Sequence, residues 1–333
     1  MRSPPDDVSD SDVVAALGAG WGLELAGLRY AAVGGGSHHW EVTDAGGHRY
    51  FATLDDLDHK GWLGHDRESA FDGLRAAFDT ALALHDEAGL AFVVAPVTAR
   101  GGETVRRAGA QYSVALFPLV DGTGGRFDHD RSPAERAEVI RMLAALHGAT
   151  PVARPHARPC DFDLPDRPRL EAALRELDRP WAGGPFSEPA RELLAGHAAD
   201  LWERLQTLDR LTGEVSQAAA APVVTHGEPH PGNVLHGPDG ILLTDWDTVG
   251  LAPPERDLWL AGGDADELAL YAEITGRRVS GVAIARYRLR WELDDVATFT
   301  GLLRAPHRRT ANTEHAWRSL ERSVRSSSSG PST

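Results

Sequence analysis

The 333-residue chain has a formal net charge of −15 and one cysteine, so an internal disulfide and a cysteine-based zinc site are excluded. Its length favours two lobes over one small domain, no apolar run approaches the roughly 20 residues of a membrane helix, and no basic face suggests nucleic-acid binding. The polar, acidic start does not resemble a signal peptide. We therefore expect a cytoplasmic monomer or dimer that binds neither membranes nor nucleic acids.

The first predicted elements surround a glycine-rich turn. A helix is expected at residues 9–17, followed by strands at 23–32 and 48–54. Between the two strands stand Gly34, Gly35, Gly36 and Ser37. Backbone N–H groups in such a turn can approach nucleotide phosphates closely, although a plain hairpin turn has the same pattern.

The next segments complete the predicted first lobe. A helix is expected at residues 69–88, and strands are expected at 92–98, near 105 and at 112–120. The last strand contains the apolar segment Phe-Pro-Leu-Val, which is also typical of a buried strand.

The rest of the chain predicts a mainly helical second lobe. Ser132 is expected to cap a helix at 132–150, because Pro133 and Glu135 follow it with the spacing of a capping box. Further helices are predicted at 169–177, 188–214, 265–275, 280–300 and 314–324. The serine-rich tail at 326–333 is expected to be disordered.

The most informative stretch runs from residue 223 to 260. Two short apolar runs, at 222–225 and 241–243, flank the polar sequence His-Gly-Glu-Pro-His-Pro-Gly-Asn and are predicted to be strands. A turn at 236–240, rich in Gly and Pro, is expected to join them as a hairpin.

This hairpin would bring three oxygen-bearing side chains together. Glu228 and Asn233 lie in the polar loop, and Asp245 ends the second strand. Phosphoryl transfer needs a carboxylate to accept the proton of the attacking hydroxyl, and it needs hard oxygen ligands for Mg²⁺. The order of base, amide and carboxylate therefore predicts a phosphoryl-transfer site.

In this order the residues resemble the aminoglycoside phosphotransferase family, whose signature is His-Gly-Asp-x-x-x-x-Asn followed by a strand ending in Asp-x-Asp. The sequence Ala-Pro-Pro-Glu-Arg-Asp at 252–257 is most similar to the spectinomycin phosphotransferase branch. The resemblance implies Glu228 as base, Asn233 and Asp245 as Mg²⁺ ligands, and Asp247 as an auxiliary ligand or an orienting residue. It also implies ATP or GTP as the phosphoryl donor.

The fold implied by the resemblance is α+β and two-lobed, like that of protein kinases. A small antiparallel-sheet lobe at 1–120 would bind the nucleotide, and a larger, mainly helical lobe at 121–325 would hold the catalytic loop and acceptor pocket. The glycine-rich turn would cover the phosphates. The backbone of Phe117 and Leu119 would bond the adenine.

The sequence departs from the family pattern at three positions. Glu228 replaces the catalytic Asp, Thr53 stands where the third strand carries a phosphate-binding Lys, and Arg75 stands near the position of its Glu partner. Either the site is degraded or the cation has moved, and we favour relocation. Arg75 is the preferred replacement because it sits on a rigid helix, with one of the two carboxylates at 55–56 as its anchor. Lys60 is the other candidate, and a surface role for it is equally consistent.

The histidines of the loop do not predict a zinc site. Pro229 and Pro231 forbid the helix that a His-x-x-x-His pair would need. His226 is instead expected to brace the loop, with His230 helping to orient it. Asp257 is expected to bond the loop backbone rather than to perform chemistry.

The resemblance implies a kinase of a small molecule, acting on a hydroxyl of a cationic, aminoglycoside- or aminocyclitol-like antibiotic. Glu292 and Asp295 are candidate ligands for the ammonium groups of this acceptor, although a solvated helix face would have the same pattern. The alternative is a pseudokinase-like protein that binds a nucleotide or ligand with weak or no phosphotransfer.

Overall fold

The structure is a computed structural model that describes residues 1–125, 131–161, 163–217, 221–262 and 265–325. The chain forms two compact units. One comprises Met1–Asp161 and Ala220–Val279, and the other comprises Phe162–Ala219 and Ser280–Thr333. The predicted lobe boundary at residue 120 stays a prediction, and the predicted disordered tail lies outside the described residues. In the part of the chain described here, no helix is both long and apolar enough to cross a membrane.

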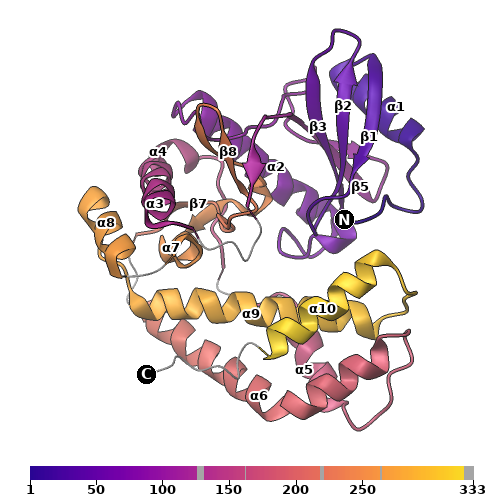
Figure 1. Ribbon diagram of the computed structural model, residues 1–333, viewed down its shortest axis with the longest axis vertical. Coiled ribbons are helices and arrows are strands. Elements are labelled where there is room, and N and C mark those ends of the chain that lie inside the picture. The colour runs from indigo at the N-terminus through magenta and orange to yellow at the C-terminus, as the bar shows by residue number, and fades with distance from the viewer. Residues whose placement is uncertain (126–130, 162, 218–220, 263–264, 326–333) are drawn as a thin grey trace. The chain divides into compact units, whose positions relative to one another are not determined.

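An antiparallel sheet begins the first unit (Figure 1). Its strands lie in the order β1-β2-β3-β5-β4. The bounds are Leu25–Ala31 for β1, His38–Asp44 for β2, Arg49–Asp56 for β3, Arg106–Ala108 for β4 and Tyr112–Pro118 for β5. Helix α1 (Asp10–Trp21), capped by Ser9 as expected, packs its Leu17 and Trp21 against one face of this sheet.

Alternation along the strands gives this sheet two different faces. One face contributes apolar side chains to the core beneath α1, including Trp40, Ala52 and Leu116. The other face carries the residues in between, so that Phe51 and Phe117 lie opposite each other on β3 and β5. Helix α2 (Arg67–Asp86) reaches this face, where the rings of Phe78 and Phe117 pack nearly at right angles with centroids 5.3 Å apart.

The expected strand at 92–98 is wrong. The segment makes only an isolated bridge between Val93 and Leu243. Its hydrogen bonds are divided between two partners, because the Val94 amide donates to the Leu243 carbonyl whereas the Val97 amide donates to the Leu116 carbonyl. Pro96, between them, has no amide hydrogen to continue a ladder.

The segment that carries the predicted site pairs differently from our expectation. Strand β7 (Val223–Thr225) pairs with β10 (Gly250–Ala252), not with the second apolar run. The hairpin is formed by β8 (Val234–Gly237) and β9 (Gly240–Leu243), and the short β6 (Thr123–Gly124) joins it through β8. The expected turn is present, but its first strand begins immediately after the polar loop.

Four helices and two short 3-10 turns complete the described part of the first unit. Helix α3 begins with the capping box of Ser132 and Glu135, as expected. The 3-10 turn η1 follows β3, and η2 follows Asp245. The bounds are Pro133–Gly148 for α3, Thr150–Ala153 for α4, Glu255–Ala261 for α7, Ala265–Thr275 for α8, Leu57–His59 for η1 and Trp246–Thr248 for η2.

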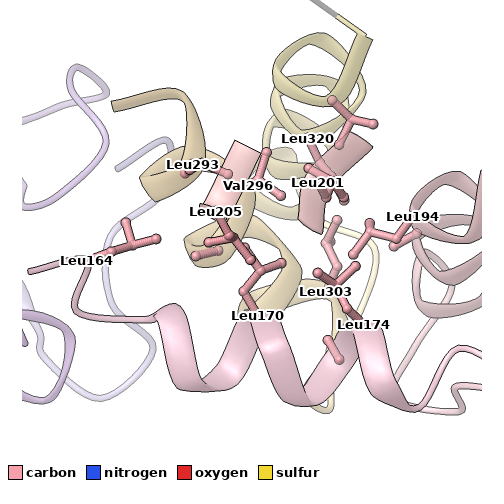
Figure 2. Close-up of a cluster of buried hydrophobic side chains, with 14 of the residues drawn as sticks. Leu164, Leu170, Leu174, Leu194, Leu201, Leu205, Leu293, Val296, Leu303 and Leu320 are labelled. Atoms are coloured by element: carbon pink, nitrogen blue, oxygen red, sulfur yellow. The ribbon is translucent and has the colours of Figure 1, made fainter. Parts of the chain in front are cut away.

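The second unit is helical in its described residues. Its helices are α5 (Arg167–Arg175), α6 (Ser187–Gln217), α9 (Gly281–Arg304) and α10 (Ala311–Arg325). Leucines from all four helices meet in one apolar core, as Figure 2 shows for Leu170, Leu201, Leu303 and Leu320. These helices have their own core, so the unit does not depend on the sheet for burial of its apolar faces.

Candidate active site

A buried carboxylate fixes the start of the loop between β7 and β8. Asp257, on α7, accepts hydrogen bonds from the amides of His226 (2.9 Å) and Gly227 (2.6 Å). It also accepts one from Nε2 of His147 at 3.0 Å, and Nδ1 of His147 is bonded to the Tyr271 hydroxyl at 2.7 Å. Burial would raise the pKa of Asp257, but the hydrogen bond and charge of His147 outweigh it and lower that pKa. The expected backbone-binding role of Asp257 is confirmed.

His226 braces the same loop as a neutral side chain. Its Nδ1 accepts the amide of Glu228 at 3.2 Å, so its Nε2 carries the hydrogen and donates to the Thr244 carbonyl at 2.9 Å. Burial lowers the pKa of His226 to about 4. Both ring nitrogens are used in bracing the loop, as expected from the sequence.

The loop contains one position that only glycine can occupy. Gly227 has φ +100°, and a Cβ there would lie 2.4 Å from Nη2 of Arg256. That guanidinium is itself fixed by Thr225 Oγ1 and the Thr248 carbonyl, each at 2.8 Å. The loop backbone therefore packs directly on the arginine.

Hydrogen bonds connect Asn233 to the backbone of Glu228 and of Thr244, the residue before Asp245. Asn233 Nδ2 donates to the Glu228 main-chain carbonyl at 3.0 Å, which fixes the orientation of the amide. The carbonyl of Asn233 accepts the Thr244 amide at 3.0 Å, next to Asp245. The hairpin pairing of Val234 with Leu243 thus places the end of the loop beside the end of β9.

Asp245 has an unusual backbone. With φ 67° and ψ 66°, it is the only non-glycine residue with positive φ in the described ranges. This conformation costs about 1–2 kcal/mol for an L-residue, and such strain gathers at functional sites. Surrounding protein and the negative charge of Asp247 raise the pKa of Asp245, but its side chain is exposed, and solvent screening limits the rise.

A fully buried lysine lies at the centre of a cluster of polar side chains. Nζ of Lys60 is 2.7 Å from Asp247 Oδ2, 2.8 Å from Asp55 Oδ1 and 3.0 Å from Ser37 Oγ. The Ser37 hydroxyl also donates to Asp55 at 2.6 Å. Burial alone would lower the pKa of Lys60, but the charges of Asp247 and Asp55 outweigh it and raise that pKa. The amine is therefore charged, and it links β3, the glycine-rich turn and η2.

Arg75 does not join this cluster. It pairs with Asp72 on its own helix at 2.9 Å, and its side chain is half exposed. The expected anchors were wrong, because Asp55 is held by Lys60 and Asp56 accepts hydrogen bonds from His59 and Gln111. Lys60, which follows β3, brings its cation to Asp247, whereas Arg75, on α2, pairs with Asp72.

The glycine-rich turn lies beside Lys60. Gly34 has φ +67°, and a Cβ on Gly36 would lie 3.8 Å from Lys60 Nζ. Thr53 is buried in β3, between His39 and Ala115 in register.

At the other end of β3, the Leu119 amide already donates to the Arg49 carbonyl at 3.1 Å. Phe117 is paired with Phe51 in the ladder. The adenine contacts expected for these two residues stay a prediction, and the Leu119 amide would have to change partner to make one.

Comparison with known proteins shows the family of this chain. Residues 29–291 match the Phosphotransferase enzyme family, and this range includes the glycine-rich turn, Lys60, the loop and Asp245. The chain belongs to this family. Protein StrN of Streptomyces griseus is 28% identical over 262 residues, covering 74% of this chain and 75% of StrN.

Solved structures show a kinase-like fold for this phosphotransferase. The complex of spectinomycin phosphotransferase APH(9)-Ia with ADP and spectinomycin has a TM-score of 0.71 at 16% identity, covering 95% of this chain and 94% of that one. Choline kinase LicA from Streptococcus pneumoniae has a TM-score of 0.59 at 11% identity, with 95% and 99% covered. Amicoumacin kinase hAmiN with AMP-PNP has a TM-score of 0.55 at 14% identity, with 95% and 93% covered. The predicted α+β kinase-like fold and the family resemblance are confirmed.

One residue of the phosphotransferase sheet escaped the sequence reasoning. His39, on β2, stacks on Phe51 with centroids 4.9 Å apart, and its Nε2 lies 3.3 Å from where a Cβ of Gly34 would stand. Its Nδ1 is buried with no hydrogen-bond partner in the described ranges, and burial lowers its pKa to about 3. Strand alternation could have placed it on the face of Thr53, although nothing in the sequence distinguishes it from its neighbour His38.

The two candidate acceptor ligands lie in the helical unit. Glu292 pairs with Arg204 at 2.8 Å, and Asp295 accepts a hydrogen bond from the Ser323 hydroxyl at 3.2 Å. Burial raises the pKa of Asp295 to about 6. Both carboxylates of the phosphotransferase thus have partners within their own unit, and their role toward an acceptor stays a prediction.

Proposed function

We propose that this chain transfers the γ-phosphoryl group of ATP or GTP to a hydroxyl of a small molecule, with an aminoglycoside- or aminocyclitol-like antibiotic as the acceptor. The observation that carries the proposal is the hydrogen bond from Asn233 to the Glu228 carbonyl beside the strained Asp245. Support for the acceptor class comes from the fold relatives that act on spectinomycin and amicoumacin. Support for a nucleotide donor comes from their complexes with ADP and AMP-PNP.

Glu228 is the base in this proposal. The acceptor oxygen attacks the γ-phosphorus, a new O–P bond forms, and the bond to the β,γ-bridging oxygen breaks, so that the nucleoside diphosphate leaves. The acceptor proton passes to the Glu228 carboxylate. The half-buried Glu228 stands on a loop fixed at both sides, by Asp257 through its first two amides and by Asn233 through its carbonyl. Phosphoryl-transfer enzymes accelerate the reaction largely by holding the reacting groups in such fixed positions.

The residues present fit a magnesium ion. No group of three or more His, Cys, Asp and Glu side chains in the described ranges forms a metal cage. Mg²⁺ is usually held by one or two carboxylates together with substrate phosphates and water, so a cage is not required. Asp245 and Asp247 offer carboxylates, and Asn233 offers Oδ1 because its Nδ2 is already used. When bound, the ion would neutralise charge on the transferred phosphoryl group.

Lys60 is the phosphate-binding cation in this proposal, in place of the lysine that Thr53 replaces. Its position beside Ser37 and Gly36 puts it under the turn that would cover the phosphates, and its fully buried Nζ would exchange one of its three partners for a phosphate oxygen. The base end of the nucleotide would lie near Phe51 and Phe117. Phe51 stands four residues before Asp55 on β3, a separation of about 13 Å at strand rise, which suits the length of a nucleoside triphosphate.

The test combines binding with turnover. Purified protein is assayed with Mg·ATP and Mg·GTP against spectinomycin, streptomycin and other aminocyclitols, and phosphorylated product is detected by mass spectrometry. Asp245→Asn should lose turnover and the nucleotide-dependent rise in melting temperature, while the folded state persists, because an amide holds Mg²⁺ less well than a carboxylate. Nucleotide binding without any phosphorylated product would point instead to a pseudokinase-like binding protein.

A further inference from the structure

One tryptophan beside the Lys60 cluster has no role in the proposed chemistry. Trp62 lies in the turn between η1 and α2, and 44% of its surface is exposed. It is the only aromatic side chain among the exposed large hydrophobic residues of the described ranges. Its ring centroid lies 5.0 Å from Nζ of Lys60, which sits over the ring.

The exposure of Trp62 is imposed by a packed turn. The Leu63 amide donates to the Lys60 carbonyl at 2.9 Å, which closes the chain around the tryptophan. A Cβ on Gly64 would lie 2.3 Å from the backbone of Ser69, and a Cβ on Gly73 would lie 2.4 Å from the Leu63 carbonyl oxygen. The turn is thus pressed against the first turns of α2, and the indole is presented to solvent by a backbone with little room to move.

The position of the Trp62 ring indicates which of the two substrates, nucleotide or acceptor, it can contact. Lys60 Nζ contacts Asp247, so the indole lies at the phosphoryl-transfer end of the proposed nucleotide site. The base end lies near Phe51 and Phe117, which is about 13 Å away along β3. The acceptor must bring its hydroxyl to the transferred phosphoryl group, so the molecule that can meet this ring is the acceptor.

We propose that Trp62 is a stacking platform for the acceptor and selects molecules with a saturated, CH-rich ring that bears ammonium groups. This inference rests on the proposed phosphotransfer function. An indole face is electron-rich, so it attracts polarised C–H groups and cations, and its large rigid surface costs little entropy to order. Lys60 meets one face of the ring, and the exposed surface is left for the acceptor.

The test separates acceptor binding from nucleotide binding. Trp62→Ala and Trp62→Phe are compared with the parent and with Ile274→Ala, a control at another exposed hydrophobic residue, on α8. The probe is spectinomycin or the member of the aminocyclitol panel that the parent phosphorylates fastest. Trp62→Ala should raise the KM for the acceptor about 3- to 30-fold, the range of cation–π contacts. Its kcat and its Kd for Mg·ATP should stay within about twofold of the parent.

Two control results are expected, and three other results would each overturn part of the inference. Trp62→Phe should recover most of the acceptor affinity, because it keeps an aromatic face, and Ile274→Ala should match the parent. If Trp62→Ala weakens Mg·ATP binding as much as acceptor binding, the ring merely shields Lys60 and the platform is refuted. If its acceptor KM is unchanged, the ring is a surface residue. A parent that phosphorylates no acceptor refutes the proposed function itself, and the platform falls with it.

Discussion

Replacing Lys60 with methionine removes the only cation that bridges Asp55 and Asp247 in the described structure. Asp55 is 1% exposed, and its Oδ2 has no hydrogen-bond partner in the described ranges, so the variant leaves a buried carboxylate without its cation. Breaking a buried ion pair on one side costs about 3–5 kcal/mol. At roughly 2–4 °C per kcal/mol, the melting temperature should fall by about 6–20 °C.

The same variant should also bind nucleotide more weakly. Loss of the proposed charge-assisted hydrogen bond to phosphate would cost about 1.5–3 kcal/mol, which corresponds to roughly a 10- to 160-fold higher Kd for Mg·ATP. Isothermal titration calorimetry measures that Kd, and differential scanning calorimetry measures the melting temperature.

Two companion variants separate stability from binding. Lys60→Met combined with Asp55→Asn removes the uncompensated buried charge, so stability should largely return while the Kd stays high. Arg75→Met disrupts only the exposed pair with Asp72, whose contribution should not exceed about 1 kcal/mol, and should leave the Kd unchanged. Parent-like melting and parent-like Mg·ATP affinity in Lys60→Met would refute the role assigned to this cluster.

Three further changes test the loop between β7 and β8. Glu228→Gln should abolish turnover yet spare the Kd for Mg·ATP, and Glu228→Asp should also lose turnover, because the change is geometric; higher turnover in Glu228→Asp would mean a decayed site. Gly227→Ala should lower the urea midpoint of unfolding more than Gly47→Ala. Both glycines have positive φ, but only at Gly227 would the added methyl group meet a neighbouring side chain, that of Arg256. Equal losses in the two variants would contradict this contact. Stability of the parent should fall as pH drops from about 6.5 toward 4, because the unfolded chain protonates His226 at its ordinary pKa while the folded loop holds that pKa near 4. In His226→Gln this slope should be shallower by about one proton, and an unchanged slope would exclude His226 as its source.

The sequence predicted what depends on short-range order. Capping residues placed the starts of α1 and α3, and the order of Glu228, Asn233 and Asp245 indicated a loop next to the end of a strand, which hydrogen bonds of Asn233 connect. Roles in catalysis and metal binding remain predictions for all three. Even here the strand pairing was wrong, because β8 forms the hairpin, and a four-residue strand next to a polar loop gives little periodic signal.

What the sequence could not give depends on distant partners. Whether Lys60 is a surface residue or a buried one is decided by Asp247, which lies 187 positions away in the chain. The segment at 92–98 has strand-like composition, but its hydrogen-bonding groups are divided between β9 and β5. His39 likewise becomes a candidate for the site only when the register of β2 and β3 sets it beside Phe51.

The hydrogen bonds that Asp257 accepts have a consequence for the motions of the loop between β7 and β8. Loops usually belong to the least protected part of a protein, and their amides exchange with solvent through small local openings. Here the amide hydrogens of His226 and Gly227 end on a carboxylate that is fully buried and tied through His147 to Tyr271 on α8. Releasing either hydrogen requires the contacts among α3, α7 and α8 to open together. The start of this loop should therefore exchange hydrogen for deuterium as slowly as the helical core, and Glu228, the proposed base, would already be in place before each turnover.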